Sequence, residues 1–254
     1  MPEWNPSQYL KFADERTRPA ADLLARVPLA APAAVVDLGC GPGNSTALLA
    51  RRWPDARVTG VDNSAAMLEQ AARDHPDWTW QLADIGAWSP GAPVDLVFAN
   101  ASLHWVPDHP TLFPRLLGQV AKGGALAVQM PRNFGEPSHT LMHKVAEDPR
   151  WRDRLKGAAR SPVAQPAVYY DLVAPLARRV DLWESEYMHV LDGPAAILEW
   201  VRGTGLRPYL EPLDRAEQAD FTARYLAALG EAYRPAADGR VLFPFRRLFL
   251  IAER

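Results

Sequence analysis

A glycine-rich turn is the segment of the chain with the clearest capacity to bind a ligand. It reads DLGCGPGNST at residues 37 to 46, between a short apolar run and a helical pattern. Glycines at alternate positions let backbone amides approach a ligand that side chains would otherwise exclude. The turn lacks the third glycine of a dinucleotide fingerprint and the lysine of a phosphate-binding loop. Taken alone, it is as often an ordinary tight turn as a binding site.

Two aspartates end the next two predicted strands. Their positions favour a binding site over an ordinary tight turn. Asp62 follows Gly43 by 19 residues, where a carboxylate can accept both hydroxyls of a ribose. Asp84 suits the exocyclic amine of adenine, and its apolar neighbour Ile85 can pack on the ring. Each aspartate alone is more often a turn or helix cap. Together with the glycine turn, they predict a site for an adenosyl group.

These segments, with FANASLHWV at residues 98 to 106, resemble the class I S-adenosylmethionine-dependent methyltransferases. The resemblance implies S-adenosylmethionine as the cofactor and S-adenosylhomocysteine as a product. It places the glycine turn at the methionine moiety, Asp62 at the ribose, and Asp84 with Ile85 at the adenine. The expected cofactor-binding residues are Asp37, Gly39, Gly41, Gly43, Asn44, Asp62, Asn63, Asp84, Ile85, Asn100 and Tyr9.

A closer resemblance extends over most of the chain, to the family of trans-aconitate 2-methyltransferases. It rests on WNPSQYLKF at residues 4 to 12 with the following ERTRPAADLL, on SLHWVPDH at 102 to 109, and on LEWVRGTGLRPYL at 198 to 210. In that family the methyl acceptor is a small tricarboxylic acid and the product is a monomethyl ester. The resemblance implies methyl transfer to a carboxylate of such an acid, trans-aconitate above all.

Methyl transfer to a carboxylate does not require a side chain that acts as a general base. A carboxylate is already ionised at neutral pH, so no general base is required. A pocket for several carboxylates needs cationic donors, preferably arginine, and 16 of the 24 arginines follow residue 130. The candidate catalytic residues are His104 and Trp105. The candidate acceptor contacts are Phe12, Arg18, Trp105, Tyr169, Tyr170, Trp200, Arg202, Arg207 and Arg246.

Each of these candidates has a plainer structural explanation. Arg202 and Arg207 can lie on a solvated surface, and tyrosines at 169 and 170 can serve in packing. Arg246 alternates with apolar neighbours and can face solvent from a strand. His104 can orient the acceptor, or take the proton of an alcohol acceptor, but a structural bridge between backbone groups is at least as common.

Neither a metal nor a macromolecular partner is indicated. His104, Asp108 and His109 lack a recognised ligand spacing, so no metal is expected. A net charge of -2 disfavours nucleic acid, and the lack of about 18 consecutive apolar residues disfavours a membrane span. The single cysteine suits a reducing compartment. We expect a cytoplasmic monomer or weak homodimer that acts on a small acid.

The elements that must position these residues alternate between strands and helices. Strands are predicted at residues 33–41, 56–62, 78–84, 94–100 and 124–130, and helices at 44–53 and 64–75, with a further helix starting at Pro19. This alternation predicts an α/β fold with a Rossmann-like, mostly parallel sheet. By the resemblance, the sheet has seven strands in the order 3-2-1-4-5-7-6, helices on both faces and a helical cap.

The chain is expected to form a single methyltransferase domain over residues 1–254. A cofactor-binding core spans 30–131, two helical cap insertions span 133–175 and 193–238, and two terminal antiparallel strands span 178–191 and 241–254. Three other functions stay open: a methyltransferase for a phenol, amine or ring carbon, a non-catalytic S-adenosylmethionine-binding protein, and a dehydrogenase with a degenerate fingerprint.

Overall fold

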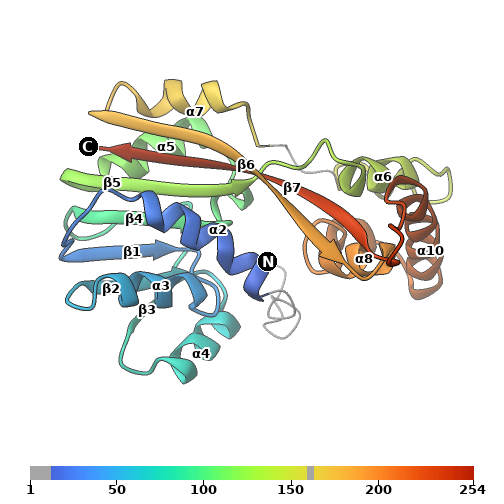
Figure 1. Cartoon of the computed structure of the whole chain (residues 1–254), viewed down its shortest axis with the longest axis horizontal. Helices are drawn as coiled ribbons and strands as arrows, with labels where there is room; N and C mark the ends of the chain where they lie inside the picture. The colour runs from blue at the N-terminus through green and yellow to red at the C-terminus, as the bar shows by residue number, and fades with distance from the viewer. Residues whose placement is uncertain (1–12, 159–162) are drawn as a thin grey trace. The chain divides into compact units, whose positions relative to one another are not determined.

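A seven-stranded sheet organises the computed structural model, which describes residues 13–158 and 163–254. The strand order is β3-β2-β1-β4-β5-β7-β6, which confirms the predicted order (Figure 1). Strands β1 to β5 pair in parallel, and β7 pairs with β5 in the antiparallel sense. The strands are β1 (Ala34–Leu38), β2 (Arg57–Asp62), β3 (Thr79–Leu82), β4 (Val94–Asn100), β5 (Val120–Pro131), β6 (Arg179–Leu191) and β7 (Val241–Glu253).

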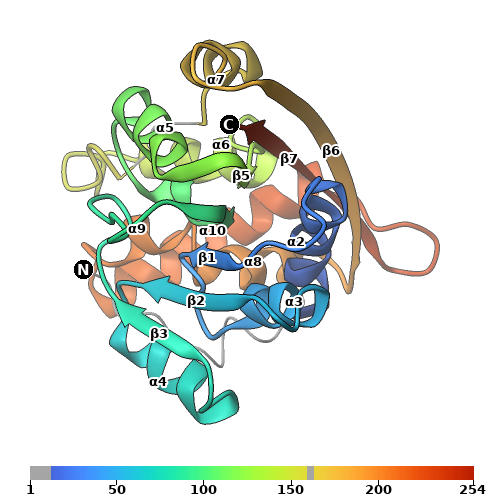
Figure 2. The same ribbon diagram turned by 90° about the vertical axis from the view of Figure 1, so that its left-hand side faces the viewer.

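The chain forms two compact units. The first contains the described residues up to Pro131, Ala164–Ser185 and Arg247–Arg254. Its helical elements are α2 (Ala13–Arg26), α3 (Asn44–Arg52), α4 (Ala65–Asp74), the single 3-10 turn η1 (Leu103–Trp105), α5 (His109–Gly118) and α7 (Pro166–Val173). Helix α7 packs against α5, as Figure 2 also shows. The parallel strands that this unit contains all end at the same edge of the sheet, where a ligand site is expected.

The second unit contains Arg132–Val163 and Glu186–Arg246. Its helices are α6 (Pro137–Ala146), α8 (Pro194–Arg202), α9 (Arg207–Leu210) and α10 (Arg215–Ala232), and α10 packs against both α6 and α8. A capping box starts α10, because Asp214 accepts from the backbone N–H of Glu217 while the Glu217 side chain accepts from that of Asp214.

The central strands are buried on both faces, as expected of parallel strands covered by helices. In β4, the four residues from Leu96 to Ala99 have no exposed surface. In β1, Val35, Val36 and Leu38 are also buried, and the only charged side chain among them is Asp37. A carboxylate at such a position needs hydrogen-bond donors inside the protein.

Several predicted boundaries differ from the structure: the first strand ends at Leu38 rather than at 41, the third ends at Leu82 rather than at 84, and two starts are also wrong. Helix α2 does not start at Pro19 but spans Ala13–Arg26, so this proline lies inside the helix. Pro19 and Ala20 are themselves buried, so the packing of this part of the helix outweighs the local preference of proline for a helix start. Strand β5 begins at Val120 rather than 124. Its first part extends because the end of β7 pairs with it, through hydrogen bonds between Arg254 and the backbone of Gly123 and Gly124.

Other local predictions are confirmed. Ser64 is the N-cap of α4, and its hydroxyl accepts from the backbone N–H of Met67. Within the described residues, no helix combines the length and apolar character that crossing a membrane requires.

Candidate active site

The glycine-rich turn between β1 and α3 bends tightly and approaches its neighbours closely. Gly39, Gly41 and Gly43 all have positive φ angles, of 75°, 55° and 95°. A Cβ atom on Gly39 would lie 2.2 Å from the Cβ of Ser102, which leaves no room for a side chain. The backbone N–H groups of Gly39 and Cys40 donate to the carbonyl of Val61 on β2. The turn therefore needs glycine for its backbone angles and, at Gly39, for space.

Asp37 holds the start of α3 from inside the protein. Its Oδ2 accepts from the hydroxyls of Ser45 and Thr46, both at 2.7 Å, and the side chain is fully buried. Its Oδ1 has no hydrogen-bond partner among the described residues. Burial raises the pKa of Asp37 to about 6, although the two hydroxyls lower it. Asp37 thus positions the turn through helix α3.

Asp62 joins the end of β2 to the glycine turn. Its Oδ2 accepts from the backbone N–H of Gly41 and its Oδ1 from that of Ser64, both at 2.9 Å. Burial raises the pKa of Asp62, and these backbone hydrogen bonds oppose the rise. Each carboxylate oxygen keeps a lone pair for a further donor. The neighbouring Asn63 is exposed.

Asp84 and Ile85, in the loop that follows β3, differ in exposure. Asp84 is exposed, and its Oδ1 accepts from the backbone N–H of Gly86 at 2.8 Å. Ile85 is buried, and its Cδ1 would lie 3.6 Å from a Cβ placed on Gly39. The structure therefore brings Ile85 next to the glycine turn and leaves the Asp84 carboxylate accessible at the same strand edge.

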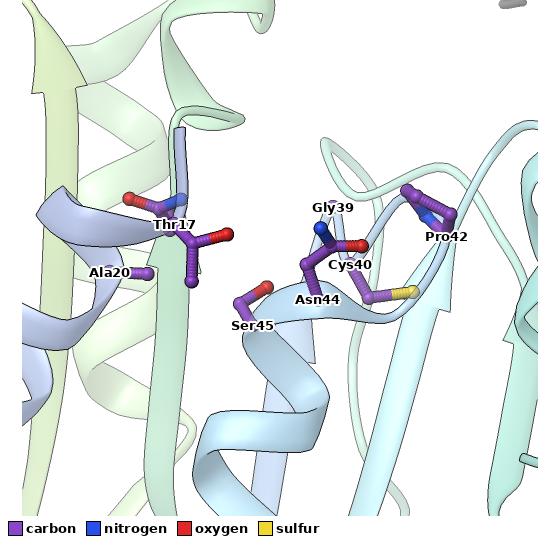
Figure 3. Close-up of a pocket in the computed structure, with 8 residues that line it drawn as sticks. Thr17, Ala20, Gly39, Cys40, Pro42, Asn44 and Ser45 are labelled. Atoms are coloured by element: carbon purple, nitrogen blue, oxygen red, sulfur yellow. The ribbon is translucent and has the colours of Figure 1, made fainter. Parts of the chain in front are cut away.

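A pocket of about 320 Å3, which includes space open to solvent, lies against this turn (Figure 3). Its lining residues are Thr17, Ala20, Gly39, Cys40, Pro42, Asn44, Ser45 and Asn100. Figure 3 shows Thr17 and Ala20 on α2, across from Asn44 and Ser45 at the start of α3. The Asn100 Oδ1 is buried and has no hydrogen-bond partner among the described residues. The pocket thus contains a hydrogen-bond acceptor that is available to a donor group of a ligand.

Sequence reasoning missed five of these lining residues: Thr17, Ala20, Cys40, Pro42 and Ser45. The i, i+3 spacing of Thr17 and Ala20 was a usable signal, because residues so spaced share a helix face. The wrong start assigned to this helix, at Pro19, hid that signal, since it left Thr17 outside the helix.

Two hydrogen bonds fix the N-terminal end of the turn that carries His104 and Trp105. Ser102 donates its hydroxyl to the carbonyl of Leu38 at 2.6 Å. The Nε2 of His109 lies 3.0 Å from the carbonyl oxygen of Leu103. The rings of His104 and Trp105 are half-buried, and their centroids are 4.9 Å apart. The candidate catalytic residues therefore sit on a well-anchored 3-10 turn directly after β4.

The two adjacent tyrosines of α7 have different environments. Tyr169 is fully buried, its hydroxyl lies 2.8 Å from Nδ1 of His109, and it accepts from the backbone N–H of Ala164. Tyr170 is 50% exposed. Tyr169 therefore serves in packing, the alternative explanation that the sequence left open, whereas Tyr170 remains accessible to a ligand.

The other predicted acceptor contacts are not among the residues that line the pocket, or they fall outside the described residues. In the second unit, Trp200 is buried among aromatic rings, with His189 at 4.7 Å between centroids. Three arginines there form ion pairs: Arg202 with Glu199, Arg207 with Glu211 and Arg246 with Glu186. Arg18 is exposed on α2. Tyr9 and Phe12 fall outside the described residues.

No group of three or more His, Cys, Asp or Glu side chains in the described part of the chain is arranged to hold a metal ion. Of the three residues considered as metal ligands, His104, Asp108 and His109, the last two have structural partners instead. Asp108 caps α5 by accepting from the backbone N–H of Thr111, and both ring nitrogens of His109 have hydrogen-bond partners.

Comparison with known proteins identifies relatives of the whole chain. Residues 35–124 match the model of a methyltransferase domain family. The trans-aconitate 2-methyltransferase of Azoarcus sp. (strain BH72) is 58% identical over all of both chains. The protein of the same name from Methylobacterium nodulans is 57% identical and covers 100% of this chain and 99% of its own.

Solved structures support the fold alone. The YcgJ protein from Bacillus subtilis aligns with a TM-score of 0.61 at 12% identity, over 93% of this chain and 98% of its own. Geranyl diphosphate C-methyltransferase from Streptomyces coelicolor A3(2) aligns with a TM-score of 0.51 at 17% identity, over 94% and 76%. The fold is thus shared with proteins of very different sequence.

Proposed function

Because the chain belongs to the family of trans-aconitate 2-methyltransferases, we propose that it transfers a methyl group from S-adenosylmethionine to one carboxylate of trans-aconitate. The products are a monomethyl ester and S-adenosylhomocysteine. Family membership over the full length of the chain carries this proposal, and the pocket between α2 and the glycine turn supports it.

The polar groups at the pocket suit this cofactor. S-adenosylmethionine carries an ammonium group, a sulfonium and two ribose hydroxyls, all of which are cations or hydrogen-bond donors. The pocket and its edge offer acceptors in Asn100 Oδ1 and the carboxylate of Asp62. The lining residues include no lysine or arginine, so nothing among them repels a sulfonium. The pyrophosphate of NAD would instead require hydrogen-bond donors at this position.

We assign the roles of the residues from this fit. Asp62 holds the ribose hydroxyls, and Asn100 accepts from the amino group of the methionine moiety. Asp84 and Ile85 hold the adenine, and the backbone of Gly39 to Gly43 lies along the methionine moiety, with Asn44 and Asn63 at its margins. Asp37 acts through the turn, because its side chain is buried beneath it. S-adenosylmethionine, when bound, supplies a methyl group on a sulfonium.

The remaining work of the chain is to position the acceptor and exclude water. A carboxylate with a pKa near 4 is ionised at neutral pH and attacks without a general base. Correct placement alone contributes roughly 7 to 11 kcal/mol to lowering such a barrier. His104 and Trp105 orient the acceptor from the anchored turn after β4.

A turnover assay tests the proposal. Purified protein is incubated with labelled S-adenosylmethionine and trans-aconitate, and the product is identified by mass spectrometry. We expect a monomethyl ester. Esterification absent with trans-aconitate, but present as methylation of an amine or a phenol, contradicts the acid assignment. Tight cofactor binding without turnover, across a broad acceptor panel, favours a non-catalytic binding protein instead.

We also propose that the enzyme works in the cytoplasm as a monomer or weak homodimer, without a metal and without nucleic acid. The single cysteine and the net charge of -2 support these assignments. Light scattering at several concentrations measures the oligomeric state. Activity that survives a strong chelator is the expected result for an enzyme that needs no metal.

A further inference from the structure

Gln129 places a buried amide at the end of β5, beside the pocket. It pairs in register with Asn100 of β4, which lines the pocket, and its backbone carbonyl accepts from the N–H of Ala101. Its side chain has no exposed surface, yet its Nε2 has no hydrogen-bond partner among the described residues. A buried amide nitrogen that lacks an acceptor is costly, so this position calls for an explanation.

Arg247 lies next to this amide on β7. Its Nη1 is 3.4 Å from the Oε1 of Gln129, and the residue is 4% exposed. Phe249 is the register partner of Gln129, and residues two apart on a strand share a face, so Arg247 and Gln129 belong to the same side of the sheet. A guanidinium keeps its charge under all ordinary conditions. The side-chain carbonyl oxygen of Gln129 thus points toward Arg247. Its side-chain nitrogen, Nε2, is left as a hydrogen-bond donor.

The neighbouring Arg246 shows the contrast that the strand imposes. It faces the opposite side of β7, is exposed and pairs with Glu186. A charged donor away from water binds a carboxylate more strongly, because the dielectric screening there is weaker.

We propose that Gln129 Nε2 and the Arg247 guanidinium anchor one carboxylate of the methyl acceptor. This inference rests on the proposed function and names the specificity site for its polyanionic substrate. The anchored carboxylate is not the one that is methylated, because hydrogen bonds and a cation lower the nucleophilicity of its oxygens. Its role is to hold the acid so that another carboxylate faces the cofactor. Gln129 and Arg247 are therefore binding residues.

Three variants test the anchor. Arg247→Met removes the charge and keeps the length of the side chain. Gln129→Glu keeps the volume and can still pair with Arg247, but it places a negative charge against the acceptor. Arg178→Met is the matched control, because Arg178 is an exposed arginine of the same unit whose ion-pair partner is Glu253. Thermal unfolding shows whether each variant is folded.

The acceptors are trans-aconitate and its three dicarboxylate truncations, itaconate, mesaconate and cis-glutaconate, each of which lacks a different carboxyl group. We expect Arg247→Met and Gln129→Glu to raise the KM for trans-aconitate by about ten-fold or more, with kcat changed far less. The Kd for S-adenosylmethionine stays within about two-fold of wild type. For the one dicarboxylate that lacks the anchored carboxylate, the KM of both variants should equal that of wild type.

Several outcomes overturn the anchor. One is a loss of affinity for S-adenosylmethionine as large as the rise in KM for trans-aconitate. That result would assign Gln129 and Arg247 to the carboxylate of the cofactor. Others are an unchanged KM in the folded Gln129→Glu variant, or an equal penalty for all four acceptors. Wild-type enzyme that forms no ester from trans-aconitate contradicts the proposed function itself. Wild-type turnover with unaffected variants contradicts the anchor alone.

Discussion

Nδ1 of His109 lies 2.8 Å from the hydroxyl oxygen of Tyr169, while Nε2 of the same ring lies 3.0 Å from the carbonyl oxygen of Leu103. A carbonyl can only accept, so Nε2 carries the hydrogen and Nδ1 of the neutral ring accepts from the tyrosine hydroxyl. That hydroxyl accepts in turn from the backbone N–H of Ala164. The network ties the turn that carries His104 to helix α7.

Tyr169→Phe tests the contribution of this network to stability. The change leaves Nδ1 of His109 and the N–H of Ala164 without this partner in a partly buried site, which costs about 1–3 kcal/mol. Chemical denaturation should show a loss of that size in the free energy of unfolding. Tyr170→Phe, at an exposed position, should change it by less than about 0.5 kcal/mol. Equal stability of the two variants would contradict the assigned network.

The buried carboxylate of Asp37 should make stability depend on pH. Its pKa in the folded protein is about 6, above the ordinary 3.8, so the folded state binds this proton more tightly than the unfolded state. The folded state therefore loses stability from this group as the pH rises between about 4 and 6. Asparagine can still accept from Ser45 and Thr46 but has no such proton.

We therefore expect Asp37→Asn to gain stability relative to wild type as the pH rises. The difference in unfolding free energy should grow by up to about 3 kcal/mol between pH 4 and pH 7, at 1.36 kcal/mol per pKa unit. Denaturant titrations of both proteins across this range measure it. Parallel pH profiles would show that the Asp37 carboxylate is ionised in both states.

Asp62→Ala should weaken binding of S-adenosylmethionine by about 1–3 kcal/mol, since it leaves ribose hydroxyls unpaired. It also frees the backbone N–H of Gly41, so Asp62→Asn, which retains an acceptor oxygen, should lose less. Calorimetry gives both dissociation constants, with Asp55→Ala as an exposed control. An unchanged dissociation constant in the alanine variant would remove Asp62 from the cofactor site.

Gly39→Ala should damage both stability and cofactor binding. The new Cβ would meet Ser102 at 2.2 Å, and its φ of 75° is strained for alanine by roughly 1–2 kcal/mol. Gly91→Ala, where nothing lies within 4 Å of the added atom, is the matched control. Thermal unfolding and cofactor titration of the two variants provide the comparison. Wild-type behaviour of Gly39→Ala would mean that the turn relaxes freely.

The parallel strands, the glycine turn and Asp62 were predictable from the sequence because each leaves a local pattern, whereas the order of the strands was implied by the family resemblance. Apolar runs that alternate with helical periodicity indicate strands of a parallel sheet, and the connections between them place the strand ends at one edge. Ser64 could be assigned as a helix cap for the same reason, since capping involves only residues three positions apart. Motif resemblance then identified the family.

The faces of the elements were decided by contacts between segments far apart in the chain. The sequence singled out Arg246, yet the pairing of β7 with β5 buries Arg247 beside Gln129 and leaves Arg246 exposed. Tyr169 and Tyr170 differ in the same way, since the contact with His109, 60 residues away, distinguishes the buried tyrosine from the exposed one. A period-two pattern marks two faces but not which of them another segment covers. That depends on tertiary packing, which no local pattern encodes.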